Sequence, residues 1–157
     1  MKRRISAITT IAAKISCHVF GAAFAVQLAV TPAFADGAIA LGRPANIATA
    51  GVAIGVASNY ADTVTAAQSA LEQCRSNKSA PASTKALCRL VAHFKDQCAA
   101  VALDRKDGTP GFGWSIGVDK ASAQDEAMAV CRATAGKGRE KFCEQSIFYC
   151  DGAARQP

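Results

Sequence analysis

Several short stretches of the chain alternate between large apolar residues and small or polar residues, which is the pattern of β-strands with two different faces. The clearest stretch is residues 112–118, where aromatic and branched side chains alternate with glycine and serine. Residues 88–94 and 143–149 alternate in a similar way, and each begins at a cysteine. Together with three apolar runs bounded by turn signals, these stretches predict six strands, at residues 38–41, 51–57, 88–94, 98–103, 112–118 and 143–149.

Two alanine-rich segments have the period of amphipathic helices. Thr65 and Ser122 each lie nine residues before a cysteine, and Gln68 and Asp125 follow them three residues later. This is the spacing of a capping box, so we expect each helix to begin there. Small residues on the buried face should let each helix lie close to a sheet. The predicted buried faces are Ala67, Ala70, Leu71 and Cys74, and Ala123, Ala127, Val130 and Cys131; the helices end at Cys74-Arg75 and Cys131-Arg132.

The predicted elements occur twice in the same order, which indicates an internal duplication. Ile54-Gly55-Val56 recurs as Ile116-Gly117-Val118, and a Cys-Arg pair follows in each copy. The copies are expected to span about residues 37–97 and 98–150, and each reads strand–strand–helix–strand. We therefore predict an α+β fold of two tandem ββαβ repeats, forming a sheet with two helices packed on it.

Two segments outside these elements have the composition of irregular structure. Residues 76–84 are rich in serine, alanine and lysine and are expected to form a mobile loop. Residues 151–157 are expected to form a disordered tail.

The first thirty-five residues have the three parts of a cleavable secretory signal peptide. A positive start at Lys2 to Arg4 precedes an apolar stretch over residues 15–30, and small residues flank Phe34 in Ala33-Phe34-Ala35. We therefore expect export to the periplasm or the extracellular space and a mature chain that begins at Asp36. An uncleaved membrane anchor is the alternative, but the apolar stretch is shorter than the roughly 20 residues of a helical span. No later stretch is expected to cross a membrane.

Most of the net positive charge belongs to the predicted signal peptide. The whole chain has a net charge of +6, but four of its 18 Lys and Arg lie in the first 35 residues, whereas all 12 Asp and Glu follow. The mature chain is therefore nearly neutral, and it contains no long run of Lys and Arg. This distribution argues against nucleic acid as a partner.

Six cysteines remain after the predicted signal peptide, and an even number in a small exported chain indicates a disulfide framework. Metal binding is the alternative, but no C-x-x-C pair occurs and His93 is the one histidine after the signal. The spacing of zinc or haem ligands is therefore absent, and we predict neither a metal nor another cofactor. Of the fifteen possible connectivities, the duplication favours Cys74–Cys88, Cys131–Cys143 and, joining the two copies, Cys98–Cys150.

Several local motifs carry a family resemblance. They are the opening Gly-Ala-Ile-Ala at residues 37–40, the alanine-rich helix that ends in cysteine, Cys-Ala-Ala at residues 98–100 and Gly-x-Gly-Trp at residues 111–114. With them, nearly all of residues 37–150 resembles the bacterial domain-of-unknown-function family 4189. The resemblance implies a small, exported, cysteine-paired protein and supplies no catalytic residues. The first copy departs from it at residues 52–54, where family members often have aromatic residues.

The sequence favours a non-enzymatic binding or interaction module of the cell envelope or the extracellular space, whose partner is an unidentified protein or envelope component. Phe112, Trp114 and Tyr149 are the candidates for its binding surface. Glycines flank the first two rings, and Tyr149 and Phe148 point to opposite faces of their strand, so that one of the two is expected to be exposed. The alternative is that Phe112 and Trp114 fill a core that contains few other aromatic residues.

A secreted hydrolase or a thiol enzyme is the alternative function. Ser115 lies in a stretch with the letters of G-x-S-x-G, but this stretch is predicted to be a strand with no helix directly after the serine. A thiol enzyme would use Cys98 with His93, which would leave an odd number of cysteines to pair. Two pairs of carboxylates are predicted to belong to a turn and to a helix start: Asp104 with Asp107, and Asp125 with Glu126. No catalytic residue is predicted.

Overall fold

The computed structural model describes residues 36–106 and 108–155. The predicted signal peptide therefore lies outside the described residues. The strands are β1 (Asp36–Gly42), β2 (Ala53–Tyr60), β3 (Arg89–Phe94), β4 (Cys98–Asp104), β5 (Phe112–Gly117) and β6 (Cys143–Cys150). The helices are α1 (Ile47–Ala50), α2 (Thr63–Arg75), α3 (Ala82–Lys85) and α4 (Lys120–Thr134), with short 3-10 turns η1 (Glu140–Phe142) and η2 (Gly152–Arg155).

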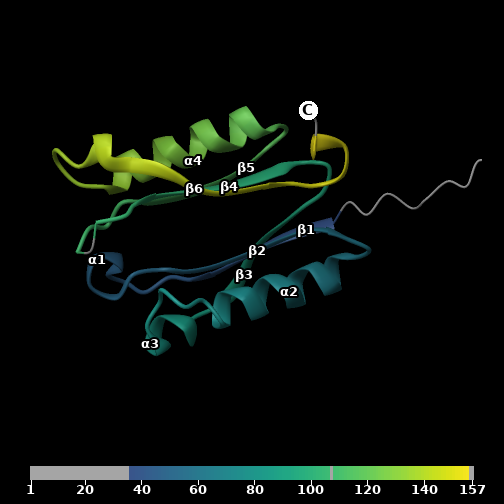
Figure 1. Ribbon diagram of the computed structural model, residues 1–157, viewed down its shortest axis with the longest axis horizontal. Helices are drawn as coiled ribbons and strands as arrows, with labels where there is room; N and C mark the ends of the chain where they lie inside the picture. Colours follow the sequence, from purple (N-terminus) through teal and green to yellow (C-terminus); the bar gives the residue numbers. More distant parts are fainter. Residues whose placement is uncertain (1–35, 107, 156–157) are drawn as a thin grey trace, which may run out of the picture. The chain divides into compact units, whose positions relative to one another are not determined.

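The α+β class and the repeated ββαβ order are confirmed, but the strands form two sheets instead of the single sheet expected. Each is a three-stranded antiparallel sheet, in the orders β2-β1-β3 and β5-β4-β6 (Figure 1). The helix α2 lies on the outer side of the first sheet and α4 on the outer side of the second. The molecule therefore has four layers in this part of the chain: helix, sheet, sheet and helix.

The alternation of side chains explains why two sheets form. In β1, Ala38 and Ala40 pack in a cluster with the helix α2, whereas Ile39 and Leu41 point to the opposite face. One helix covers the alanine face, but the bulky face must also leave water. The second sheet has the same need, since Val101 and Phe112 line its inner face. The two bulky faces cover each other, and Ile39 and Val101 are fully buried there.

Small residues bring each helix close to its sheet, as the sequence predicts. A Cβ atom on Gly55 would clash with the carbonyl oxygen of Ala70, and one on Gly113 would clash with that of Ala127. The helices bury a narrow stripe of small side chains, whereas Val130, which was expected to be buried, is 39% exposed. The buried stripes are Ala66, Ala70 and Cys74 in α2, and Ala123, Ala127 and Cys131 in α4.

Both helices begin earlier than the capping pattern predicted. The N-caps are Asp62 and Asp119, whose carboxylates accept hydrogen bonds from the backbone N–H groups of Thr65 and Ser122, each at 2.8 Å. These bonds lower the pKa of both carboxyl groups. Aspartate is as good an N-cap as serine or threonine, and here the hydroxyl residues occupy the third helical position. Gln68 is therefore not a capping partner.

Strand pairing corrects the register of the duplication. Ala40 pairs with Gly55 in the first sheet, and Ala102 pairs with Gly113 in the second. Because both glycines sit under the same turn of their helix, Gly55 corresponds to Gly113 and not to Gly117. The recurrence of Ile-Gly-Val is thus shifted by four residues from the structural equivalence. Phe112 and Trp114 are the counterparts of Ile54 and Val56, since they pair with corresponding residues of the central strands.

The six cysteines form the three pairs that the duplication favours, Cys74–Cys88, Cys98–Cys150 and Cys131–Cys143. The first and third bridges join each helix to the start of the strand that follows it. The bridge Cys98–Cys150 was expected to join the two copies, but it connects β4 with β6 inside the second sheet. The reason is that these two residues are direct cross-strand partners.

The two segments expected to be irregular have definite contacts. Residues 76–84 run into the helix α3, and Thr84 is fully buried and donates a hydrogen bond to the carbonyl oxygen of Ala50 at 2.7 Å. Residues 151–155, from the expected tail, include η2, and Asp151 is fully buried. No helix of the described residues is long and apolar enough to cross a membrane.

Candidate functional site: the paired helix grooves

The three aromatic residues predicted to form a binding surface occupy different environments. Phe112 is 3% exposed and lies between the two sheets. Trp114 is partly buried against the same cluster, while Tyr149 on β6 is 47% exposed. The strands β5 and β6 are opposite edges of the second sheet. The structure therefore gives Phe112 the core position that was the alternative prediction, and it separates Trp114 from Tyr149 by one strand.

The residues considered for an enzyme are also not brought together. Cys98 is bonded to Cys150 and has no thiol, and His93 is exposed on β3 of the other sheet. Ser115 is buried under α4, where its hydroxyl donates to the carboxylate of Glu126 at 2.8 Å. A serine nucleophile needs a neighbouring base that can take its proton. In the part of the chain that the structure describes, the side chain bound to the Ser115 hydroxyl is the carboxylate of Glu126 and not a histidine.

The predicted carboxylate pairs likewise have structural partners. Asp104 receives two hydrogen bonds from the guanidinium of Arg139, at 2.8 and 2.7 Å. Burial by itself would raise the pKa of Asp104, but Arg139 and the backbone N–H of Lys106 hold it below its usual value. Asp107 lies outside the described residues. Among the described side chains, no group of three or more His, Cys, Asp and Glu residues could hold a metal ion.

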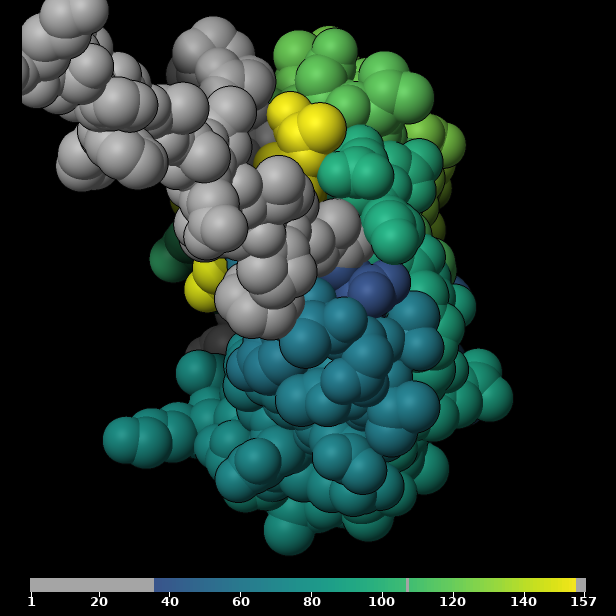
Figure 2. Space-filling model, turned by 90° about the vertical axis from the view of Figure 1, so that its right-hand side faces the viewer, coloured from purple at the N-terminus to yellow at the C-terminus, as the bar shows by residue number. Residues whose placement is uncertain are grey.

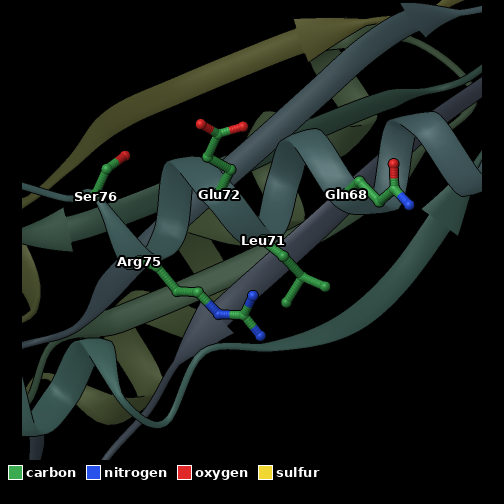
Figure 3. A pocket seen from close by; sticks show the side chains of 5 residues that line it. All are labelled: Gln68, Leu71, Glu72, Arg75 and Ser76. Carbon is green, nitrogen blue, oxygen red and sulfur yellow. The ribbon is translucent and has the colours of Figure 1, made fainter.

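A shallow groove of about 390 Å³ lies along the outer side of α2 (Figure 3). The close view shows Leu71 and Arg75 pointing to one side of the helix, whereas Glu72 points to the other. Leu71 is partly buried because it packs against the cluster between α2 and the first sheet. The lining residues are Gln68, Leu71, Glu72, Arg75 and Ser76.

A second groove of about 430 Å³ lies between α4 and β6. The amide nitrogen of Gln145 donates to the carbonyl oxygens of Val101 and Ile147, at 3.0 and 2.7 Å. Its amide oxygen is buried and has no hydrogen-bond partner in the described part of the chain. The wall on the helix side consists of Gln124, Asp125, Met128 and Arg132.

The two grooves use the same positions of the two repeats. Counted from the equivalent cysteines Cys74 and Cys131, each groove has an acceptor six residues before the cysteine, a long apolar side chain three residues before it and an arginine one residue after it. Both arginines are exposed, and neither takes part in the two ion pairs of the described residues. The corresponding sets are Gln68, Leu71 and Arg75 in the first groove, and Asp125, Met128 and Arg132 in the second.

This arrangement defines a simple chemistry. The guanidinium of Arg75 or Arg132 can bind a carboxylate with two parallel hydrogen bonds. The apolar residue one turn earlier can cover an aliphatic side chain, and the acceptor at the far end can receive an N–H. Seven residues of helix rise about 10 Å, which is the length of about three residues of extended peptide.

Sequence reasoning did not identify these grooves. It assigned Gln68 and Asp125 to capping boxes, and the true caps at Asp62 and Asp119 leave both side chains on the helix surface. The signal that could have found the site is the repeated Cys-Arg pair. Consecutive helical residues point about 100° apart, so a buried cysteine turns the next side chain toward solvent.

A third hollow, of about 400 Å³, lies between the connection of β1 with β2 and the β4–β5 hairpin. Its walls come from residues 47–52, 103–106, 108–109 and 111, with Ser79 and Pro81 also lining it. The carboxylate of Asp104 in this hollow is already bound by Arg139. This hollow does not recur in the two copies, and we therefore regard the helix grooves as the better candidates.

Comparison with known proteins gives a family match but no assigned activity. The model of the family described as Domain of unknown function (DUF4189) matches residues 37–150. No curated protein and no solved structure matches the chain. The matched residues run from the second residue of β1 to the last residue of β6, and they include the two long helices α2 and α4 and all three disulfides. The chain thus belongs to the DUF4189 family.

Proposed function

We propose that this protein is an exported, non-enzymatic binding module that holds extended, carboxylate-bearing segments of a partner in the grooves of α2 and α4. The observation that carries the proposal is the recurrence of an acceptor, an apolar side chain and an arginine at the same three positions of both repeats. Neither copy needs the arginine of this set for its core, because Arg75 and Arg132 are exposed and form no ion pair within the described residues.

Export is supported by the cysteines. Three disulfides are typical of a small oxidised protein of the extracellular type, and all six cysteines of residues 36–157 are paired. The predicted signal peptide agrees with this compartment. The partner is accordingly a protein or another component of the periplasm, the envelope or the surrounding medium.

The rigidity of the fold favours binding by a few contacts. Each helix is fixed to its sheet by the close approach at Gly55 or Gly113 and by a disulfide at its last turn. A rigid groove loses little conformational entropy when it is occupied. Each groove is open and is lined by a single cationic side chain, so a single site should bind weakly. Two sites on one molecule can together hold a partner that presents several such segments.

The test is a titration of the exported, oxidised protein with short peptides, followed by NMR at the arginine side chains. Acetyl-Ala-Leu-Asp is the probe, and acetyl-Ala-Leu-Asn amide is its uncharged control. We expect the acidic peptide to shift the Nε–H signals of Arg75 and Arg132 and the control to leave them in place. Arg75→Glu and Arg132→Glu should each remove one of the two sites.

Arg43→Glu is the matched control variant, because Arg43 is exposed and lines none of the three hollows. It should bind the acidic peptide like the unmodified protein. Shifts confined to the hollow beside Asp104, or equal shifts with the two peptides, would contradict the proposed sites.

A further inference from the structure

Asp151 is a buried carboxyl group of which only one oxygen has a hydrogen-bond partner in the described part of the chain. Its side chain is 0% exposed, and one carboxylate oxygen accepts a hydrogen bond from the backbone N–H of Asn59 at 2.6 Å. The other oxygen is buried and has no hydrogen-bond partner in the described part of the chain. An unpaired buried carboxylate is unfavourable, and such a group normally has a cation or a proton beside it.

The charged neighbours of Asp151 make a cation the better partner. Burial raises the pKa of Asp151 above its usual value, although the backbone N–H groups of Asn59 and Asp96 act to lower it. The nearby carboxylates of Asp36 and Asp96 make a smaller contribution that raises it. Asp96 itself receives a hydrogen bond from the backbone N–H of Ala153 at 2.8 Å. Neither ion pair of the described residues involves Asp151. The carboxyl groups of Asp36, Asp96 and Asp151 are thus near enough to influence one another, and none of them takes part in an ion pair of the described residues.

Asp36 is the first residue of β1, and the pairing of β1 with β2 places it close to Asn59. It pairs across the strands with Tyr60, the residue next to Asn59. Asn59 has a φ of 63° and lies in a β-bulge of β2. From the partner of Ala38 to the partner of Asp36, β2 advances by three residues, whereas the corresponding step along β5 is two residues. Figure 2 shows the start of β1 and the C-terminal segment on the same face of the molecule. The bulge therefore turns the backbone N–H of Asn59 toward Asp151.

The second copy holds the corresponding position covalently. Counted along the paired strands, Asp36 is the counterpart of Cys98, and Asp151 follows directly after Cys150. The disulfide Cys98–Cys150 ties the start of β4 to the end of β6. The start of β1 has no such bridge, so another interaction must hold it if it is to be equally well fixed.

We propose that Asp151 binds the α-ammonium group of Asp36, which is formed when the signal peptide is removed. Water hydrolyses the peptide bond between Ala35 and Asp36; a carboxylate stays on Ala35, and the amine of Asp36 takes up a proton. The new positive charge lies at the start of β1, where the carboxyl groups of Asp36, Asp96 and Asp151 influence one another. The ion pair ties the start of the first sheet to the end of the second, and only the processed protein can form it.

The first experiment measures the α-ammonium group directly in the exported protein. Intact mass should show a chain that begins at Asp36, and an NMR titration should give its α-ammonium a pKa above the ordinary value of about 8. Asp151→Asn should bring this pKa back toward the ordinary value. Lys95→Gln, which removes an exposed cation near Asp96, should leave it unchanged.

A second variant keeps the proposal testable if Asp151→Asn does not fold. One alanine inserted between Ala35 and Asp36, with the cleavage site kept before it, moves the ammonium by one residue, or about 3.3 Å. The insertion should lower both the melting temperature and the pKa of the α-ammonium. Where both single variants fold, the double variant should melt no lower than the less stable of the two. A mature chain that starts elsewhere, or an ordinary pKa in the unmodified protein, overturns the proposal.

Discussion

The two copies share the contact between helix and sheet, the aspartate cap and the helix-to-strand disulfide, but they differ between the sheets and at the ends of the strands. Gly55 and Gly113 occupy the same place under their helices, and the buried helix stripes are the same run of two alanines and a cysteine. Between the sheets, however, Phe112 and Trp114 stand where the first copy has Ile54 and Val56. The close helix–sheet contact admits only small residues, while the inner faces need only fill the space between them.

The ends of the copies differ as well. The central strand of the first copy ends at Gly42, where a Cβ atom would clash with the carbonyl oxygen of Thr84. The corresponding residue of the second copy is Asp104, which is bound by Arg139. The end of the central strand is therefore held by backbone packing in the first copy and by an ion pair in the second. The following changes test how far the two copies are equivalent.

The largest expected effect is the loss of the bridge that only the second copy has. Replacing Cys98 and Cys150 by alanine opens a link of sequence separation 52, against 14 and 12 for the other two bridges. On a chain-entropy estimate, this change should lower the free energy of unfolding by about 4 kcal/mol, and loss of either short bridge by about 3 kcal/mol. Urea unfolding without reductant measures all three. A smaller loss for the long bridge than for the short ones would disprove this ranking.

The next effect should be the same in both copies. Gly55→Ala and Gly113→Ala each place a methyl group against helix backbone, which cannot move aside as a side chain can. Each should lower the free energy of unfolding by about 1–3 kcal/mol, as overpacking does. Ala129→Ser, on the exposed side of α4, is the control and should change little. A clear difference between the two glycine variants would show that the helix contacts are not equivalent.

Acid should weaken the second copy specifically at Asp104. Its pKa is lowered in the folded protein, so its contribution to stability is present above the ordinary pKa of about 3.9 and is lost as the pH falls through the lowered value. Asp104→Asn should therefore lower the melting temperature at pH 7 and have less effect at pH 2. Thermal unfolding at the two pH values measures this. An equal effect at both would show that the carboxylate's charge does not contribute.

The smallest effect on stability is expected at the groove arginines. Arg75→Ala and Arg132→Ala remove exposed side chains without an ion pair in the described residues, so each should change the free energy of unfolding by less than about 0.5 kcal/mol. Each should also halve the number of sites for acetyl-Ala-Leu-Asp in calorimetry. Binding that survives the double variant would place the ligand elsewhere.

The local patterns of the chain were sufficient for its elements. Alternation along residues 112–118 and 143–149 reflects two unlike faces of a strand, and that property belongs to the strand alone. The cysteine pairing was also accessible, because the duplication and the short separations within Cys74–Cys88 and Cys131–Cys143 make it the simplest arrangement. These features depend on neighbours in the chain or on its repetition.

Other features were decided by contacts that no local pattern contains. Asp62 and Thr65 are both acceptable N-caps, and the backbone geometry at the helix start selected the aspartate. The equivalence of Gly55 with Gly113 follows from which residue meets the helix backbone and not from matching letters. The grooves depend on this same placement, because a groove exists only once a helix lies against a strand.

The sequence by itself thus determined the strands, the two helices, the repeat and the six paired cysteines of this protein. The tertiary structure decided that the strands form two sheets, since the bulky face of each sheet that its helix does not cover could be buried only against another such face. It also decided that Asp151 lies inside the protein with one oxygen unpaired. Burial is a property of the assembled layers, and for that reason it could not be inferred from a short segment at the end of the chain.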